Sequence, residues 1–157
     1  MTNKEIKIAY TEYASLDELS AQDRVLAEAA IEAVATSYAP YSNFNVGAAV
    51  RFNDGEIIRG SNQENAAYPS GMCAERTALF YASASHPGVP MNALAIAAAQ
   101  NGELLKDPVT PCGACRQVMI QYQLKSGNPM EIMLIGAGRI WKFANVESLL
   151  PFVFDSI

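Results

Sequence analysis

Apolar residues recur at helical spacing in three segments of the chain. The first segment follows Ser20, a residue that suits the position before a helix, and it ends ahead of Pro40. The second covers residues 73–85 and the third residues 112–124. Because apolar positions three and four residues apart form one face of a helix, the pattern predicts three helices packed on a common core.

Extended segments alternate with these helices. Residues 44–52 and 56–60 are separated by Asn53-Asp54-Gly55, which predicts a β-hairpin. Residues 93–99 form a continuous apolar run typical of a buried strand, and residues 130–135 and 140–143 predict two more strands. We expect an α/β fold, a three-layer α/β/α sandwich around a mixed five-stranded sheet.

The first 20 residues differ from the rest of the chain. Ile6, Ile8 and Tyr10 alternate with more polar residues, which indicates a short strand or an extended arm. We therefore divide the chain into an N-terminal arm, residues 1–20, and one domain, residues 21–157.

Composition narrows the classes of protein that remain. Half of the 157 residues are hydrophobic and 17% are charged, which fits one well-buried globular domain and excludes disorder. The net charge is −5 with dispersed basic residues, which argues against a nucleic acid polymer as partner and leaves a small molecule as substrate. Since neither an export signal nor a membrane-spanning run is recognisable, we expect a cytoplasmic protein with no membrane partner.

All three cysteines lie at the predicted starts of two helices. Cys112 and Cys115 are three residues apart, so they can face one way from a first helical turn, and Cys73 opens the other helix. Helix N-termini favour the thiolate that binds metal. On spacing alone, Cys112 and Cys115 could equally be a redox dithiol or two packing thiols. Three protein ligands with a fourth position for water are typical of a catalytic zinc site.

Glu75 favours catalysis over a structural metal site. It lies two residues after Cys73, and a hydrolytic zinc needs a carboxylate that moves protons near its water. By itself, the Glu75-Arg76 pair could simply be two solvated charges on a helix surface.

Five motifs resemble, in order, those of the small zinc-dependent cytidine deaminases. They are Tyr41-Ser42-Asn43-Phe44-Asn45-Val46-Gly47-Ala48-Ala49, Gly60-Ser61-Asn62-Gln63-Glu64-Asn65-Ala66-Ala67-Tyr68, Cys73-Ala74-Glu75-Arg76, Pro111-Cys112-Gly113-Ala114-Cys115-Arg116-Gln117 and Leu149-Leu150-Pro151. The resemblance runs from about residue 21 to 154 and implies hydrolytic deamination of cytidine and deoxycytidine to the uridine nucleosides and ammonia, in pyrimidine salvage. It implies Zn²⁺ on Cys73, Cys112 and Cys115, Glu75 as the proton shuttle, and Arg76 as a donor to a ligand thiolate.

The resemblance also implies contacts with the nucleoside. The residues concerned are Phe44 against the pyrimidine ring, Asn62 and Glu64 on the ribose, and Ala74, Tyr68 and Phe154 elsewhere around the substrate. Tyr68 and Phe154 match residues that contact neighbouring subunits, which implies a homotetramer with shared active sites. Phe152 stands where the family pattern leads us to expect a smaller residue, and it could be the inserted ring instead of Phe154.

Three other functions remain open at this stage. The first is deamination of a modified cytosine nucleoside such as blasticidin S, by enzymes that share the Cys-Ala-Glu and Pro-Cys motifs. The second is nucleic acid editing, disfavoured by the acidic charge and by Cys73, where editing deaminases typically carry histidine. The third is a non-catalytic zinc domain or a redox dithiol.

Overall fold

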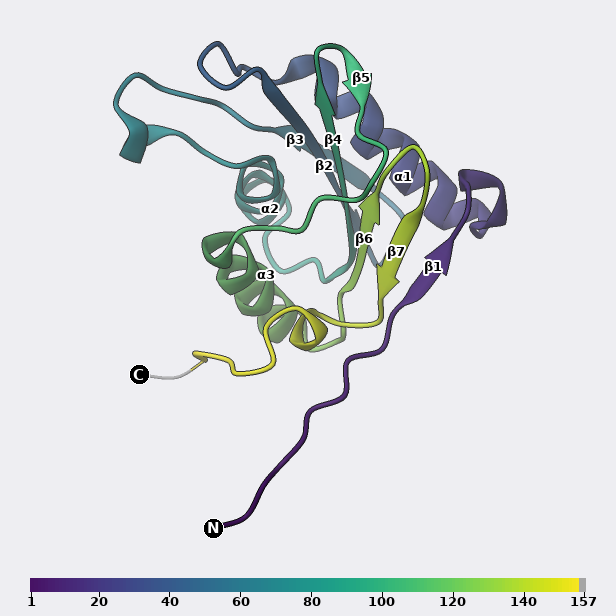
Figure 1. Cartoon of the computed structure of the whole chain (residues 1–157). Helices are drawn as coiled ribbons and strands as arrows, with labels where there is room; N and C mark the ends of the chain where they lie inside the picture. The colour runs from purple at the N-terminus through teal and green to yellow at the C-terminus, as the bar shows by residue number, and fades with distance from the viewer. Residues whose placement is uncertain (156–157) are drawn as a thin grey trace.

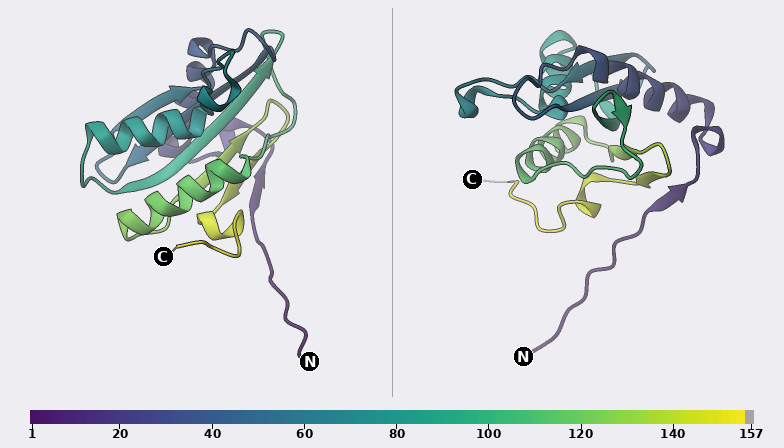
Figure 2. Two further views of the ribbon diagram at one scale, coloured as in Figure 1. Left: turned by 90° about the vertical axis from the view of Figure 1, so that its left-hand side faces the viewer. Right: turned by 45° about the horizontal axis from the view of Figure 1, so that its top comes forward.

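Three α-helices cover the two faces of one sheet in the computed structural model, which describes residues 1–155 (Figure 1). Helix α1 (Ala21–Ala33) packs on one face, whereas α2 (Ala74–Ser85) and α3 (Gly113–Ser126) pack on the other. The two further views in Figure 2 show the same layers. The predicted three-layer sandwich is confirmed, and α2 and α3 begin one residue after the cysteines that were expected to open them.

The sheet has seven strands among the described residues, in the order β1-β7-β6-β4-β2-β3, with β5 paired to β4 beside this path. The strands are β1 (Thr11–Tyr13), β2 (Phe44–Phe52), β3 (Ile57–Ser61), β4 (Met91–Gln100), β5 (Glu103–Leu104), β6 (Glu131–Ile135) and β7 (Ile140–Phe143). Among these seven described strands, only β4 and β6 pair in parallel, so the sheet is mixed as expected. The five predicted strands are all present, but the predicted number was too low. Strands of two or three residues, such as β5 and β1, are too short to show a periodicity.

The N-terminal arm joins the sheet only at its end. Residues 1–10 have no regular secondary structure and extend away from the domain in all views, and Thr11–Tyr13 pair antiparallel with β7 (Figures 1 and 2). Of the two options for residues 4–10, the structure therefore shows the extended arm and not the strand. The division of the chain at residue 21 stays a prediction.

Two glycines let the helices approach the sheet closely. A Cβ at Gly60 in β3 would lie 2.5 Å from the backbone nitrogen of Ala78 in α2. On the opposite face, a Cβ at Gly47 in β2 would overlap the backbone of α1 at Ala30. Because α2 begins just after Cys73, the missing side chain at Gly60 helps to set the position of the metal ligands.

A cluster of four charges ties α1 to three strands. Asp23 accepts from Arg51 at 3.1 Å and from Lys142 at 2.7 Å, and Glu131 lies 2.9 Å from Lys142 and 3.6 Å from Arg51. Burial opposes ionisation of Asp23, but its hydrogen bonds from Lys142 and Arg51 outweigh that effect and lower its pKa. The cluster therefore holds a buried carboxylate in its charged form.

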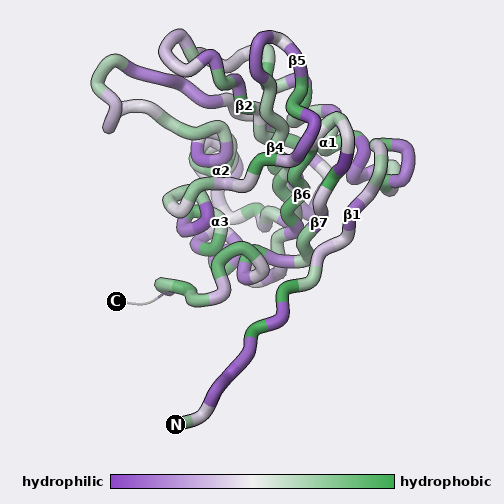
Figure 3. The backbone as a smooth tube through the Cα atoms, in the orientation of Figure 1, coloured by the Kyte–Doolittle hydropathy of each residue, from purple (hydrophilic) through white to green (hydrophobic). Residues whose placement is uncertain are grey.

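Hydrophobic residues concentrate on the central strands, as Figure 3 shows along β4 and β6. Residues 93–99 of β4 are all buried, which confirms the continuous apolar run as an interior strand. Within residues 1–155, no helix combines the length and hydropathy that a bilayer span requires.

Candidate active site

The three cysteines converge where α2 and α3 begin. Cys73 and Cys112 are the residues that cap these helices, and Cys115 lies in the first turn of α3. Neither capping thiol accepts a hydrogen bond from the backbone N–H groups at the start of its own helix, so both can face the other sulfurs. The Sγ atoms are 4.0 Å apart for Cys73 and Cys112 and 3.4 Å apart for Cys112 and Cys115, and all three lie within 4.8 Å of one another.

This cluster fits a zinc ion. Four tetrahedral ligands at a Zn–S distance of about 2.3 Å place sulfurs roughly 3.8 Å apart, which falls between the observed separations. Thiolate sulfur is also a preferred zinc ligand. The cluster of Cys73, Cys112 and Cys115 therefore fits a three-thiol zinc site.

Charge within the cluster is distributed unevenly. The neighbouring Cys115 thiol and the Arg76 guanidinium together lower the pKa of Cys73 to about 5, although burial opposes this. Cys115 shows the reverse, since its interaction with Cys73 and its burial raise its pKa. Cys73 is thus the thiol that loses its proton more readily, whereas the raised pKa of Cys115 opposes the proton loss that zinc binding requires.

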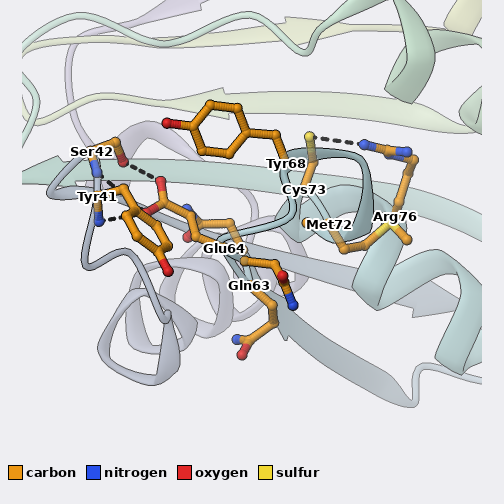
Figure 4. A pocket seen from close by; sticks show the side chains of 11 residues that line it. Tyr41, Ser42, Gln63, Glu64, Tyr68, Met72, Cys73 and Arg76 are labelled. Atoms are coloured by element: carbon orange, nitrogen blue, oxygen red, sulfur yellow. Dashed lines mark hydrogen bonds between the residues drawn. The ribbon is translucent and has the colours of Figure 1, made fainter.

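Arg76 turns its guanidinium toward the metal ligands. Its Nη2 donates to Cys73 Sγ over 3.4 Å, as Figure 4 shows. The two residues are three apart, so this contact crosses one turn at the start of α2. The geometry is the one expected for an arginine that offsets the excess negative charge of three thiolates.

Glu75 is buried beside this cluster. It lies in the first turn of α2 and only 6% of its surface is exposed. Burial is the main cause of its raised pKa, and the negative charge on Cys73 raises it further. A raised pKa means that the carboxyl holds a proton more readily than an exposed glutamate does, which suits a group that accepts and then releases protons.

A cavity of about 530 Å³ opens beside Cys73. Its wall is formed by Tyr41, Ser42, Asn62, Gln63, Glu64, Asn65, Tyr68, Gly71, Met72, Cys73 and Arg76. Asn62, Glu64 and Tyr68 thus line the same cavity as Cys73, and their contacts with a substrate stay predictions. Tyr41, Ser42, Gln63 and Met72 were not singled out; the only sequence signal for the first three was that they lie within the quoted motifs.

Asn62 and Glu64 organise the cavity wall through the backbone. The Asn62 amide donates to the Phe44 carbonyl and accepts from the Val46 N–H, both at 2.8 Å. Glu64 accepts from the N–H groups of Tyr41 and Ser42 and from the Ser42 hydroxyl, toward which it points in Figure 4. These bonds, led by that from the Ser42 hydroxyl, lower the pKa of Glu64. Asn62 retains one donor and one acceptor position, and Glu64 retains one acceptor position.

The remaining predicted contacts lie outside the cavity wall. Phe44 begins β2 half-buried, and the Ala74 side chain is buried in the core, so only its backbone could meet a ligand. Phe154 is exposed, and its carbonyl accepts from Gln117 of α3 at 2.8 Å; Phe152 is exposed as well. Within the described chain, neither ring lines the cavity.

The fold and site together define a zinc-binding α/β protein with a buried carboxylate beside three cysteine ligands. Comparison with known proteins identifies the family to which the chain belongs. Residues 20–127 match the family model described as the cytidine and deoxycytidylate deaminase zinc-binding region. The chain belongs to this family.

Named relatives agree. The chain is 49% identical to a cytidine deaminase of Halalkalibacterium halodurans over 62% of this chain and 70% of that protein, and 42% identical to one of Sporosarcina psychrophila over 76% and 81%. Among solved structures, a cytidine deaminase of Burkholderia pseudomallei is 44% identical with a TM-score of 0.71, over 83% of this chain and 97% of that one. The expected family and fold are thus confirmed.

Proposed function

We propose that this protein hydrolyses cytidine and deoxycytidine to uridine and deoxyuridine with release of ammonia. The observation that carries the proposal is the buried Glu75, held by the same helical turn that presents Cys73 to the other two thiols. A structural zinc site needs no carboxyl group beside its ligands. If Glu75 and Arg76 were only two solvated surface charges, Glu75 would be exposed and not buried.

Zinc held by the three thiols would supply Lewis acidity that makes water nucleophilic near neutral pH. Glu75 takes one proton from the attacking water and delivers it to the pyrimidine ring nitrogen, as the water oxygen bonds to the ring carbon that carries the amino group. Glu75 then moves the remaining hydroxyl proton to the amino group, so that the carbon–nitrogen bond breaks and ammonia leaves as the carbonyl forms. Its raised pKa, caused mainly by burial, helps Glu75 to hold the proton between the two transfers. Arg76 keeps Cys73 in its thiolate form.

The free positions on Asn62 and Glu64 support a role in holding ribose hydroxyls at the cavity wall. An amide can donate and accept, and a carboxylate accepts, so the two can fix the direction of a diol. We expect Phe44, at the start of β2, to pack against the pyrimidine ring of the substrate. We expect the backbone of Ala74 to contact the substrate as well.

We also infer a homotetramer with shared active sites. Tyr68 at the cavity wall is 81% exposed, and Phe152 and Phe154 expose their rings at the end of the described chain. Large exposed aromatic side chains are typical of interfaces.

Phe154 is the ring we expect to enter a neighbour's cavity. Replacing Phe154 and Phe152 separately by alanine tests this. Loss of the ring that enters the neighbour's cavity should raise KM for cytidine, whereas loss of the other ring should not.

The test follows loss of the ultraviolet absorbance of cytidine, with zinc content measured on the same sample. Glu75→Ala should keep about one zinc per chain and lose at least 100-fold in turnover, the lower range for a general acid and base. Glu103→Gln, an exposed acid in β5, is the matched control and should retain full rate. Substantial turnover by Glu75→Ala refutes the assigned role. Zinc with no cytidine turnover, but with turnover of blasticidin S, would instead favour deamination of a modified nucleoside.

A further inference from the structure

The N-terminal arm carries apolar side chains that its own domain covers only in part. Residues 1–10 are all exposed, and Ile6, Ile8 and Tyr10 each expose 52% of their surface. The family match begins at residue 20, so this segment lies outside it. Figure 3 shows hydrophobic positions along the arm as it leaves the domain.

The arm continues the line of an edge strand. β1 pairs with β7 on one side, and as the end of the strand order it has an unpaired second edge. Such an edge presents N–H and C=O groups that can add another strand. Tyr10 already packs on Trp141 and Phe143, with ring centroids 5.7 and 5.4 Å apart. In an extended chain, Ile6 and Ile8 share the face of Tyr10.

We propose that residues 4–12 of two copies pair as antiparallel strands about a twofold axis at Ile8. In this register Ile8 faces the Ile8 of the other copy, Ile6 faces Tyr10, and Lys4 faces Glu12. The apolar residues then pair with each other. At both ends Lys4 lies opposite Glu12, whose carboxylate also accepts from Trp141 Nε1 at 2.7 Å and lies 3.8 Å from Arg139.

Moving the twofold axis by one residue in either direction gives a less favourable strand pair. Moving the axis to Lys7 places two lysines opposite each other, and moving it to Ala9 places Ile6 opposite the Glu12 carboxylate. Like charges opposite one another destabilise a strand pair, as does an apolar residue facing a charge. Of these three registers, the sequence of the arm favours the one centred on Ile8.

A twofold axis uses the same surface on both copies, as in most homodimers. An isolated two-stranded ribbon is marginal in water, but here each strand extends a sheet through its β1–β7 pairing. Pairing would make the sheets of two copies continuous and would close the exposed edge of each. The occupant of the β1 edge is thus a second copy of this chain.

Cysteine scanning of the full-length, zinc-loaded protein tests the register. Single cysteines at positions 6 to 10 are oxidised in air and run on a non-reducing gel beside the unsubstituted protein, whose thiols are metal ligands. Ile8→Cys should give the most covalent dimer, several-fold above Lys7→Cys and Ala9→Cys. Equal yields at positions 7, 8 and 9, or a maximum elsewhere, would overturn the proposal.

Charge reversal in the Ile8→Cys protein gives a second readout. Lys4→Glu places two carboxylates opposite each other and should slow dimer formation several-fold at low salt. Lys7→Glu makes the same charge change opposite Ala9 and should leave the rate unchanged. An equal effect of both substitutions would show nonspecific association and contradict the register. Zinc content should stay at the unsubstituted level throughout, which separates this outcome from damage to the site.

Discussion

The Arg76 guanidinium donates to the Cys73 sulfur over 3.4 Å, across one turn at the start of α2. This bond joins a cation to a zinc ligand and, with the Cys115 thiol, holds the pKa of Cys73 at about 5. The contact gives the protein a way to moderate three negative ligands on one metal ion.

Removing this donor should weaken the site without unfolding the protein. We expect Arg76→Gln to lower turnover or zinc affinity about 10- to 100-fold, the usual cost of losing a partner of a metal ligand. In metal-free protein, the pKa of Cys73 should rise toward the ordinary value, because a neutral amide stabilises thiolate less well. Ultraviolet thiolate absorbance against pH measures this. An unchanged titration would show that Arg76 does not act on Cys73.

Zinc removal should abolish turnover and lower the thermal midpoint, because three thiols at two helix ends lose their common partner. One equivalent of zinc should restore both. Zinc binding should also weaken as pH falls, because Cys115 must lose its proton to bind the metal. Its interaction with Cys73 and its burial raise the pKa of Cys115 and oppose that loss. Dialysis against a chelator at a series of pH values measures the loss. A metal-free protein with full turnover would exclude a catalytic zinc.

Gly60→Ala should disturb the site from a distance. The added methyl would lie 2.5 Å from the Ala78 nitrogen, so α2 must shift and carry Cys73 and Glu75 with it. We expect about 1 to 3 kcal/mol of lost stability and reduced turnover. Gly113→Ala is the matched control, since its methyl meets no atom within 4 Å although it lies beside Cys112. Equal losses from both variants would contradict the packing explanation.

Asp23→Asn should destabilise the fold by about 3 kcal/mol at pH 7, because Arg51 and Lys142 would lose a buried carboxylate partner. The pKa of Asp23 is lowered in the folded protein, so its contribution is present above the ordinary value of 3.8 and disappears as pH falls through the folded value. The stability difference between the two proteins should therefore shrink below pH 3.8. Urea unfolding at a series of pH values checks this, and a constant difference would contradict it.

Local patterns were enough to predict the main elements. Helical spacing placed α1, α2 and α3, and the Asn53-Asp54-Gly55 turn placed the hairpin of β2 and β3. These features depend on neighbours within a few residues, so the sequence displays them directly. The two short strands β1 and β5 were not predicted, because they are defined by pairing with β7 and β4 and not by a local pattern.

The sequence by itself determined the chemistry of the candidate site: three thiols, two of them one helical turn apart, and a carboxylate two residues from the third. Only the tertiary structure brought Cys73 within 4.0 Å of Cys112, buried Glu75, and used both ends of the Asn62 amide on β2. The reason is physical. Spacing along a helix is set by local backbone geometry, whereas distance between helices and depth of burial are set by packing across the sheet, here through close approaches such as that at Gly60.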